Sequence, residues 1–544
     1  MRILRWLLGP EPEPFQPGRD QPVASTHLLS RWIFLRSLGL IYFSAFYSLL
    51  FQIKGLIGPR GILPASEYLS AVAQYYPDVR RYWLAPTLLW FSSGDHAVMV
   101  ICWIGVAASI AVILNLWPRA ALLASLLCFL SFVSAARDFS GYQSDGMLLE
   151  AGFISLFFAP RGLLPGLGAD HPPSRASLFL LRWEWFRIYF ESGLVKLMSG
   201  DYSWRHLTAM DDYYQNGPLP TWVGWYVQHL PHWVHAATAF MTLAAELALV
   251  FTLFLPRRFK IACFFILTPF QIGIILTANY TFLNYLVLCL GFLLLDDRWL
   301  RWVLPERWKK YASPAIEPAP AESSGNGQET LRDRIERRSS TLRRIVAGWC
   351  LGWVFYVTTA LLLGILLGGS ILWERPIQVV EPFRIANSYG LFAVMTHERY
   401  EIEFQGSLDG RTWTAYPFRH KPQDLRRAPG IYAPYQPRFD WNLWFASLGS
   451  WRQNMFVVRT EELLLRNDPE VLHLFAGDPF AGKPPQHVRA VLWQYWFTDM
   501  ATKRKEGLWW RRELQGLYAP SLERLPNGEI GEANSGSGLL DLRP

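Results

Sequence analysis

The hydrophobic residues of this chain are gathered in long blocks rather than spread evenly along it. A helix that crosses a bilayer needs about 20 mostly apolar residues, whereas a helix of a soluble core needs only an apolar stripe. We therefore expect a polytopic α-helical bundle with about nine transmembrane helices. The blocks are Trp32–Gln52, His96–Trp117, Ala120–Ala136, Asp145–Pro160, Ala176–Met198, Trp233–Leu255, Ile261–Ala278, Tyr280–Leu295 and Ile345–Gly369.

Beyond the last block the pattern changes to the alternation that is typical of strands. Polar and apolar residues alternate over Tyr400–Ser407 and over Thr412–Tyr416, and the pair Asp409-Gly410 between them predicts a β-hairpin turn. The stretch Glu461–Phe475 has a helical pattern, and Val488–Phe497 fits either a strand or a helix. We therefore expect a mixed, mostly β domain at the C-terminus.

These changes of pattern divide the chain into six parts. Leu331–Arg344, inside the polar linker, also fits an amphipathic helix on the membrane surface. The parts are an N-terminal segment (1–31), about eight transmembrane helices (32–298), a linker loop (299–344), a last transmembrane helix (345–370), a β-rich domain (371–525) and a flexible tail (526–544).

The distribution of Lys and Arg predicts the orientation in the membrane, because basic residues accumulate in short loops that are not translocated. With the N-terminus inside, the inner segments hold most of them, including Arg119, Arg257, Lys260 and the polar linker. We expect a cytoplasmic N-terminus and, after an odd number of crossings, an extracytoplasmic C-terminal domain. The membrane would be the inner or plasma membrane in a bacterium and that of the endoplasmic reticulum in a eukaryote.

The composition agrees with a membrane protein and disfavours several classes of function. All five cysteines lie in predicted spans, which argues against a disulfide framework or a redox site. Basic and acidic residues nearly balance after Ile371, so nucleic-acid binding is not indicated. The signature motifs of hydrolases, ATPases and dehydrogenases are absent from the sequence. We therefore expect no cofactor.

Ionisable residues inside the predicted spans are the first candidates for function, because an unpaired charge in hydrocarbon is costly. On the span Ala176–Met198, Glu184, Arg187 and Glu191 fall on one face of a helix. They form either a structural stripe that joins this helix to its neighbours or a functional network. The candidate polar network comprises Arg36, Glu150, Arg182, Glu184, Arg187, Glu191 and Glu246.

Lys196 stands apart on the same span, since residues 192 and 200, one turn away, are not carboxylates. Either its amine reaches the membrane interface, or it is a desolvated catalytic group. His229, His232 and His235 suggest a zinc site, but Pro231 interrupts their helix. We expect these histidines at the interface and no metal.

Eight segments resemble the lipase maturation factor family, in order and along nearly the whole chain. The resemblance implies a multi-pass membrane protein that helps secreted lipases reach an active folded state, with its C-terminal domain on the lumenal side. It also implies membrane lipids and a secreted client protein as partners. The segments are Phe34–Phe43, Gln52–Pro64, Tyr142–Glu150, Leu181–Asp201, Asp212–Pro220, Ala278–Tyr285, Pro382–Phe392 and Arg438–Ala446.

A surface that binds an unfolded client should expose aromatic side chains in one patch. Trp441, Trp444 and Phe445 are the candidate for this surface, and the alternative is that they form the core of their own domain. Such a protein would act as a chaperone rather than an enzyme.

A shorter resemblance implies another class of function. Tyr189–Leu197 is similar to a segment of the vitamin K-dependent γ-carboxylase (HTTM) superfamily, in which a membrane-embedded lysine acts as a base. The resemblance maps this role onto Lys196. An enzyme of this kind should place Lys196 on an internal cavity that lipid can reach, beside another polar group such as Tyr189 or His206.

Overall fold

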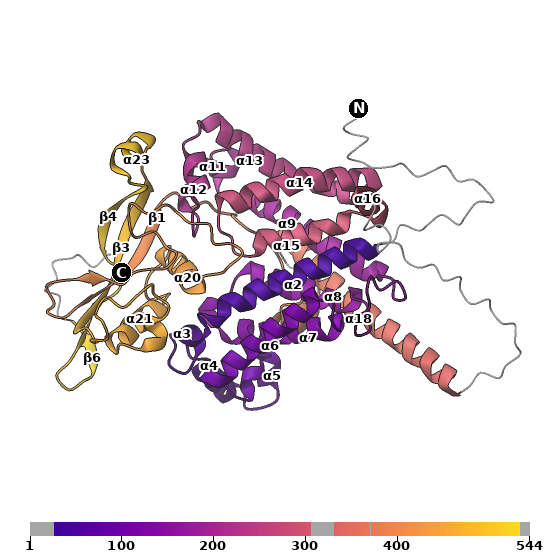
Figure 1. The fold of residues 1–544 in the computed structure, drawn as a ribbon, viewed down its shortest axis with the longest axis horizontal. Helices are drawn as coiled ribbons and strands as arrows, with labels where there is room; N and C mark the ends of the chain where they lie inside the picture. The colour runs from indigo at the N-terminus through magenta and orange to yellow at the C-terminus, as the bar shows by residue number, and fades with distance from the viewer. Residues whose placement is uncertain (1–26, 306–330, 370–371, 534–544) are drawn as a thin grey trace, which may run out of the picture.

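The computed structural model describes residues 27–305, 331–369 and 372–533, and the predictions for the other residues lie outside this part of the chain. A bundle of helices forms most of the molecule, and the C-terminal domain, orange to yellow, lies at one end of the bundle (Figure 1). The predicted division into a helical part and a C-terminal domain that contains a sheet is therefore seen in the structure.

All nine predicted apolar blocks are helical. Six spans in the described residues are long and apolar enough to cross a membrane, namely α2, α6, α7, α13 with its 3-10 extension, α14 and Thr341–Leu367 of α18. Of the remaining three, α8 and α15 are short and α9 is rich in charge. The bounds are α2 Leu28–Leu50, α6 Asp95–Ile113, α7 Pro118–Ala135, α8 Gln143–Phe158, α9 Arg175–Met198, α13 His232–Leu247, α14 Arg257–Thr277, α15 Leu283–Gly291 and α18 Leu331–Leu367.

The two ends of the bundle are built differently. At one end, the amides of Leu28 and Leu29 donate hydrogen bonds to the Asp297 carboxylate at 2.7 and 2.9 Å, next to α16 (Asp297–Val303). The opposite end carries short helices that face the C-terminal domain (Figure 1). These are α3 Ile53–Ile57, α4 Ala65–Tyr75, α5 Arg80–Leu84, α10 Tyr202–Arg205, α11 Ala209–Asn216 and α12 Trp222–Gln228.

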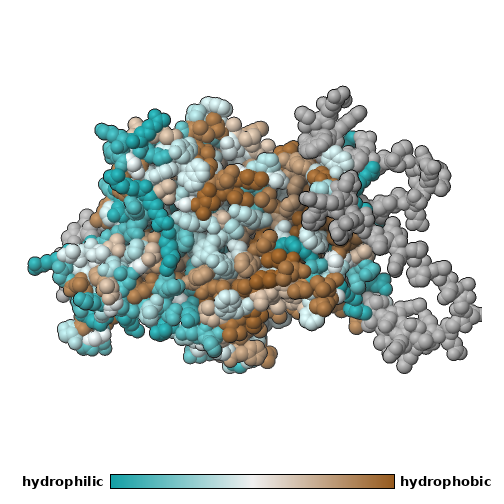
Figure 2. All heavy atoms as spheres, viewed as in Figure 1, coloured by the Kyte–Doolittle hydropathy of each residue, from teal (hydrophilic) through white to brown (hydrophobic). Residues whose placement is uncertain are grey.

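The surface of the bundle is strongly hydrophobic. Figure 2 shows hydrophobic atoms gathered over the helices in the middle of the molecule and hydrophilic atoms over the C-terminal domain. Large apolar side chains such as Trp103, Phe240 and Ile266 are exposed on the bundle. An apolar surface of this extent is typical of helices that contact lipid.

An antiparallel sheet of six strands organises the C-terminal domain, with the order β2-β1-β3-β5-β6 and with β4 also paired to β3. The predicted hairpin is confirmed, and Gly410 adopts φ +70° in its turn. The strands are β1 Arg399–Ser407, β2 Thr414–Ala415, β3 His487–Phe497, β4 Trp510–Leu517, β5 Leu522–Arg524 and β6 Ile530–Glu532.

Helices share this domain with the sheet, so "mostly β" overstated the share of strands. The predicted helix Glu461–Phe475 is two helices, because the residues between α21 and α22 form a turn with Asn467 at φ +55°. The helices are α19 Arg375–Val380, α20 Arg438–Ser447, α21 Phe456–Leu465, α22 Pro469–Leu472 and α23 Met500–Glu506.

Three predicted boundaries are wrong. The N-terminal boundary at residue 31 and the tail boundary at 525 cut through structure, since α2 starts at Leu28 and β6 pairs with β5. The pair Asn527-Gly528 is a hairpin turn signal, and it joins β5 to β6 inside the predicted tail. The linker boundary at 344 falls inside α18, which begins at Leu331 and so includes the suggested amphipathic helix.

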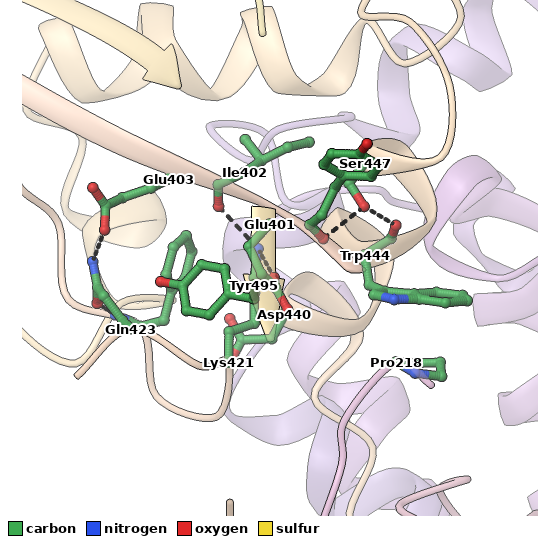
Figure 3. A network of polar contacts seen from close by, with 12 residues as sticks. Pro218, Glu401, Ile402, Glu403, Lys421, Gln423, Asp440, Trp444, Ser447 and Tyr495 are labelled. Atoms are coloured by element: carbon green, nitrogen blue, oxygen red, sulfur yellow. Dashed lines mark hydrogen bonds and ion pairs between the residues drawn. The ribbon is translucent and has the colours of Figure 1, made fainter. Parts of the chain in front are cut away.

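One face of β1 carries buried charges, because Arg399, Glu401 and Glu403 are two residues apart and therefore point the same way. Lys421 pairs with Glu401 at 2.9 Å and donates to the Ile402 carbonyl at 2.9 Å (Figure 3). Gln423 donates to Glu403 at 3.1 Å in the same view. These bonds fix the chain that follows β2 across the face of the sheet.

Glu461 is a buried carboxyl in α21 that pairs with no cation in the described residues. Burial raises the pKa of Glu461 well above its ordinary value. Folding therefore binds a proton here, and the stability that this group contributes is complete below its unfolded pKa and is lost as pH rises through the higher folded pKa.

We expect the melting temperature to fall with rising pH and Glu461→Gln to flatten this dependence, measured by thermal unfolding in detergent between pH 5 and 9. If the melting temperature of Glu461→Gln varies with pH in the same way as that of the unchanged protein, this expectation is wrong.

Candidate functional site

A cavity of about 500 Å³ lies where the bundle meets the C-terminal domain. We call it the junction groove. Its walls come from the α7–α8 and α11–α12 connections, the start of α15, the segment 390–396 and α20. Lining residues from α20 include Trp441, Trp444 and Phe445, so the predicted aromatic cluster does line one cavity.

The three aromatic side chains differ in exposure. Trp441 and Trp444 are buried, whereas Phe445 is 42% exposed. Trp441 packs edge to face against Tyr142 of the bundle and against Tyr280, with ring centroids 6.3 and 6.2 Å apart. The cluster is therefore part of the contact between the two domains, and Phe445 is the ring that it leaves accessible.

A buried ion pair holds α20 against the bundle. The Arg438 guanidinium donates to both oxygens of the Asp145 carboxylate at 2.8 Å, and also to the Phe139 carbonyl at 2.8 Å. A two-point contact of this kind fixes orientation as well as distance. Arg438 is thus one of the contacts that set how the two domains lie relative to each other, together with Arg399, which donates to the Gln215 and Pro218 carbonyls at 3.0 and 3.1 Å.

The candidate polar network is only partly assembled in the structure. Arg187 forms ion pairs with Glu150 and, at 3.9 Å, with Glu191, all three side chains being fully buried. This trio connects α8 and α9; it contains Arg187 and Glu191 of the predicted stripe but not Glu184. Both helices belong to the bundle (Figure 1).

The segment after α18 completes this network. The amide of Asn387 donates to Glu150 at 2.9 Å, and its carbonyl accepts from Arg187 at 2.6 Å. Tyr389 donates its hydroxyl to Glu150 at 3.0 Å and its amide to Glu191 at 2.6 Å. Sequence reasoning missed Asn387 and Tyr389, although both lie in one of the segments that carry the family resemblance.

The other members of the candidate network lie elsewhere. Arg36 stacks over Trp32 at 4.8 Å, and Arg182 donates to the Leu293 carbonyl at 2.6 Å. Glu184 is buried and makes no hydrogen bond to any residue that the structure describes. The Arg187 cluster thus does not include the other four charged residues, which are Arg36, Arg182, Glu184 and Glu246.

Lys196 is 2% exposed and donates to both oxygens of Glu246 at 2.7 Å. Its amine therefore points to a partner inside the bundle rather than to the surface, and this partner lies 50 residues away in sequence. Gly193 permits the pair, since a Cβ there would lie 2.8 Å from Leu247 and 2.9 Å from Glu246.

The three histidines do not converge on one point. His232 and His235 share the Asp211 carboxylate at 2.9 Å, whereas His229 contacts the carbonyls of Trp225 and Thr498. Asp211 was not identified from the sequence, because it belongs to another helix. No group of three or more potential metal ligands suited to an ion is found in the described residues.

Comparison with known proteins gives a consistent result along the chain. A family profile described as "Lipase maturation factor transmembrane domain" matches residues 29–302, and "Lipase maturation factor C-terminal domain" matches residues 385–520. No solved structure matches significantly.

Curated relatives cover almost the full length. The chain is 31% identical to bovine lipase maturation factor 1, over 95% of this chain and 94% of that protein. It is 32% identical to human lipase maturation factor 1, over 95% of this chain and 93% of that protein. It is 31% identical to human lipase maturation factor 2, over 91% of this chain and 82% of that protein. Because the profiles and the relatives match both the bundle and the C-terminal domain, the chain belongs to the lipase maturation factor family.

Proposed function

We propose that this membrane protein assists the maturation of a secreted lipase by holding an apolar segment of the partly folded client in the junction groove. The observation that carries the proposal is the groove itself, which is lined by aromatic side chains from both domains. The client class follows from the names of the relatives, which are lipase maturation factors.

The groove has the properties that such binding requires. Phe445 and Val394 line it and are 42% and 65% exposed, so an incoming chain can contact them without displacing the protein's own core. Gln143 and Asn216 also line the groove, where their side chains hydrogen-bond the backbone of Gly390 and Thr396 and so fix the segment 390–396 in its wall. The exposed apolar side chains on a fixed wall favour binding of an unfolded chain.

The topology that suits this role has about nine crossings, with the N-terminus in the cytoplasm and the C-terminal domain outside. Arg119 and Arg257 lie at the end of the bundle opposite the C-terminal domain, near α16. Basic residues mark the cytoplasmic side of membrane proteins. The groove then opens on the side where exported proteins fold.

The enzymatic alternative has less support. Lys196 does line an internal cavity with Tyr189, as that alternative requires. Its amine, however, donates hydrogen bonds to both oxygens of Glu246, a carboxylate partner that this alternative does not call for. The full-length relatives are named as maturation factors.

Charge introduced into the groove should impair maturation. The variants Phe445→Glu and Val394→Glu each place a carboxylate in the groove, where a bound apolar client segment would desolvate it. We expect each variant to lower the activity of the client lipase about fivefold or more. The measurement is the activity per mass of a secreted lipase co-expressed with each variant. Leu408→Glu is the matched control, because Leu408 is exposed on the same domain and does not line the groove. Equal activity with all three variants would reject the proposed role of the groove.

A further inference from the structure

A second cavity, of about 240 Å³, lies inside the bundle between α9, α13, α14 and α15. We call it the bundle cavity. Its walls are largely apolar, with Ile188, Phe270, Ile274 and Val287 among them. The proposed lipase function does not require this cavity, although the cavity adjoins the junction groove. The two share as lining residues Tyr213, Tyr280, Leu283, Leu391 and Phe392.

Polar side chains are concentrated on part of its wall. Asn284 donates to the Gln271 side-chain oxygen at 2.7 Å, and Gln271 donates to the Tyr189 hydroxyl oxygen at 2.8 Å. Since the Tyr189 oxygen is the acceptor in this chain, its own hydrogen remains available to donate. No acceptor for that hydrogen is found among the described residues.

Lys196 supplies a second donor on the same wall. An ammonium group carries three N–H bonds, and Lys196 directs hydrogen bonds to the two oxygens of Glu246. One N–H therefore remains, on a nitrogen 5.0 Å from the centre of the Trp204 ring. The cavity thus offers two donors to a ligand and no net charge.

Two helices beside this cavity, α13 and α14, make few contacts with each other. α13 packs mainly on α9 and α11, whereas α14 packs mainly on α12 and α15, so these two helices do not close on each other along their length. Gly273 lines the cavity on α14 and has open space beside it, and the adjacent Ile272 is exposed on the lipid-facing surface. The side between α13 and α14 is therefore the one from which an acyl chain would reach the cavity.

We propose that the bundle cavity binds a single-chain neutral acyl ester of the monoacylglycerol type, with its carbonyl oxygen accepting from Tyr189 and Lys196. A carbonyl oxygen suits this site because it can accept a hydrogen bond from each of the two donors. An anionic head group would compete with Glu246 for Lys196 and leave a buried carboxylate unpaired. The cavity, at about 240 Å³, is smaller than the roughly 300–1,000 Å³ of most ligand sites, so it suits the ester end of one acyl chain, with the rest of the chain extending between α13 and α14.

The test uses the purified full-length protein in nanodiscs and a monoacylglycerol that carries a photoreactive diazirine in its chain. Mass spectrometry should locate saturable labelling on α13 and α14. Unlabelled monoacylglycerol should compete, and the corresponding free fatty acid should compete less well. Labelling spread evenly over the lipid-facing helices, or stronger competition by the fatty acid, overturns the proposal.

Variants make the test specific. Thr242→Phe fills the cavity and should reduce labelling about tenfold or more, and Tyr189→Phe keeps the ring, removes one donor and should weaken binding about fivefold. Ile266→Phe, on the lipid-facing side of α14 and outside the cavity, is the matched control. Labelling of the folded Tyr189→Phe protein with unchanged affinity overturns the assignment of the donor, even if Thr242→Phe fails to fold.

Discussion

Arg187→Met should destabilise the protein more than any other single change in the bundle. Arg187 is fully buried and pairs with both Glu150 and Glu191, so its removal leaves two carboxylates buried without a cation. Removing one partner of a buried ion pair typically costs about 3–5 kcal/mol. We expect loss of folded protein from the membrane fraction, measured by fluorescence-detected size-exclusion chromatography and thermal unfolding in detergent.

The matched variant removes the carboxylates as well. The triple substitution Glu150→Gln, Glu191→Gln and Arg187→Met leaves no unpaired charge in the cluster and should recover much of the lost stability. Arg452→Met controls for loss of an arginine, since Arg452 is exposed and only stacks on Trp451. A stable Arg187→Met protein, or a triple variant no better than the single one, would show that this cluster does not hold α8, α9 and the segment after α18 together.

Arg438→Met should separate the C-terminal domain from the bundle without unfolding either part. The guanidinium joins α20 to Asp145 and to the Phe139 carbonyl, and its loss leaves the Asp145 carboxylate buried and unpaired. We expect the activity of a co-expressed lipase to fall about tenfold or more, together with faster proteolysis between α18 and β1. The activity per mass of secreted lipase and limited proteolysis of the purified protein are the two measurements.

A double-mutant cycle isolates this contact. Asp145→Asn alone should have a similar effect, and the double variant with Arg438→Met should be less impaired than the sum of the two single variants. If the two single effects simply add, the pair does not couple the domains, and the placement of the groove must depend on other contacts.

Local patterns predicted the elements well where each depends on its own sequence. The apolar blocks are helices in the structure. The Asp409-Gly410 turn, with alternating polar and apolar residues on both sides, forms the β1–β2 hairpin. The length of a span was harder to predict, since α8 ends at Phe158 and α15 is prolonged only by a 3-10 turn. Apolar residues alone do not distinguish a crossing helix from a shorter buried one.

Long-range pairs could not be predicted from one sequence. Lys196 pairs with Glu246 on α13, and Asp145 pairs with Arg438 almost 300 residues later in the chain. Helix packing, rather than sequence spacing, brings these partners together. The candidate aromatic cluster could be proposed from its residue types. Its division into buried Trp441 and accessible Phe445 depends on how α20 packs against the bundle.

Site-specific photocrosslinking tests the role of the junction groove most directly. A photoreactive amino acid is placed at Phe445 inside the groove or at Leu408 outside it, in cells that synthesise a secreted lipase. The account predicts a crosslink from position 445 to the newly made, inactive lipase, which disappears as the lipase becomes active. Absence of any lipase crosslink from position 445, or an equal crosslink from position 408, would contradict it.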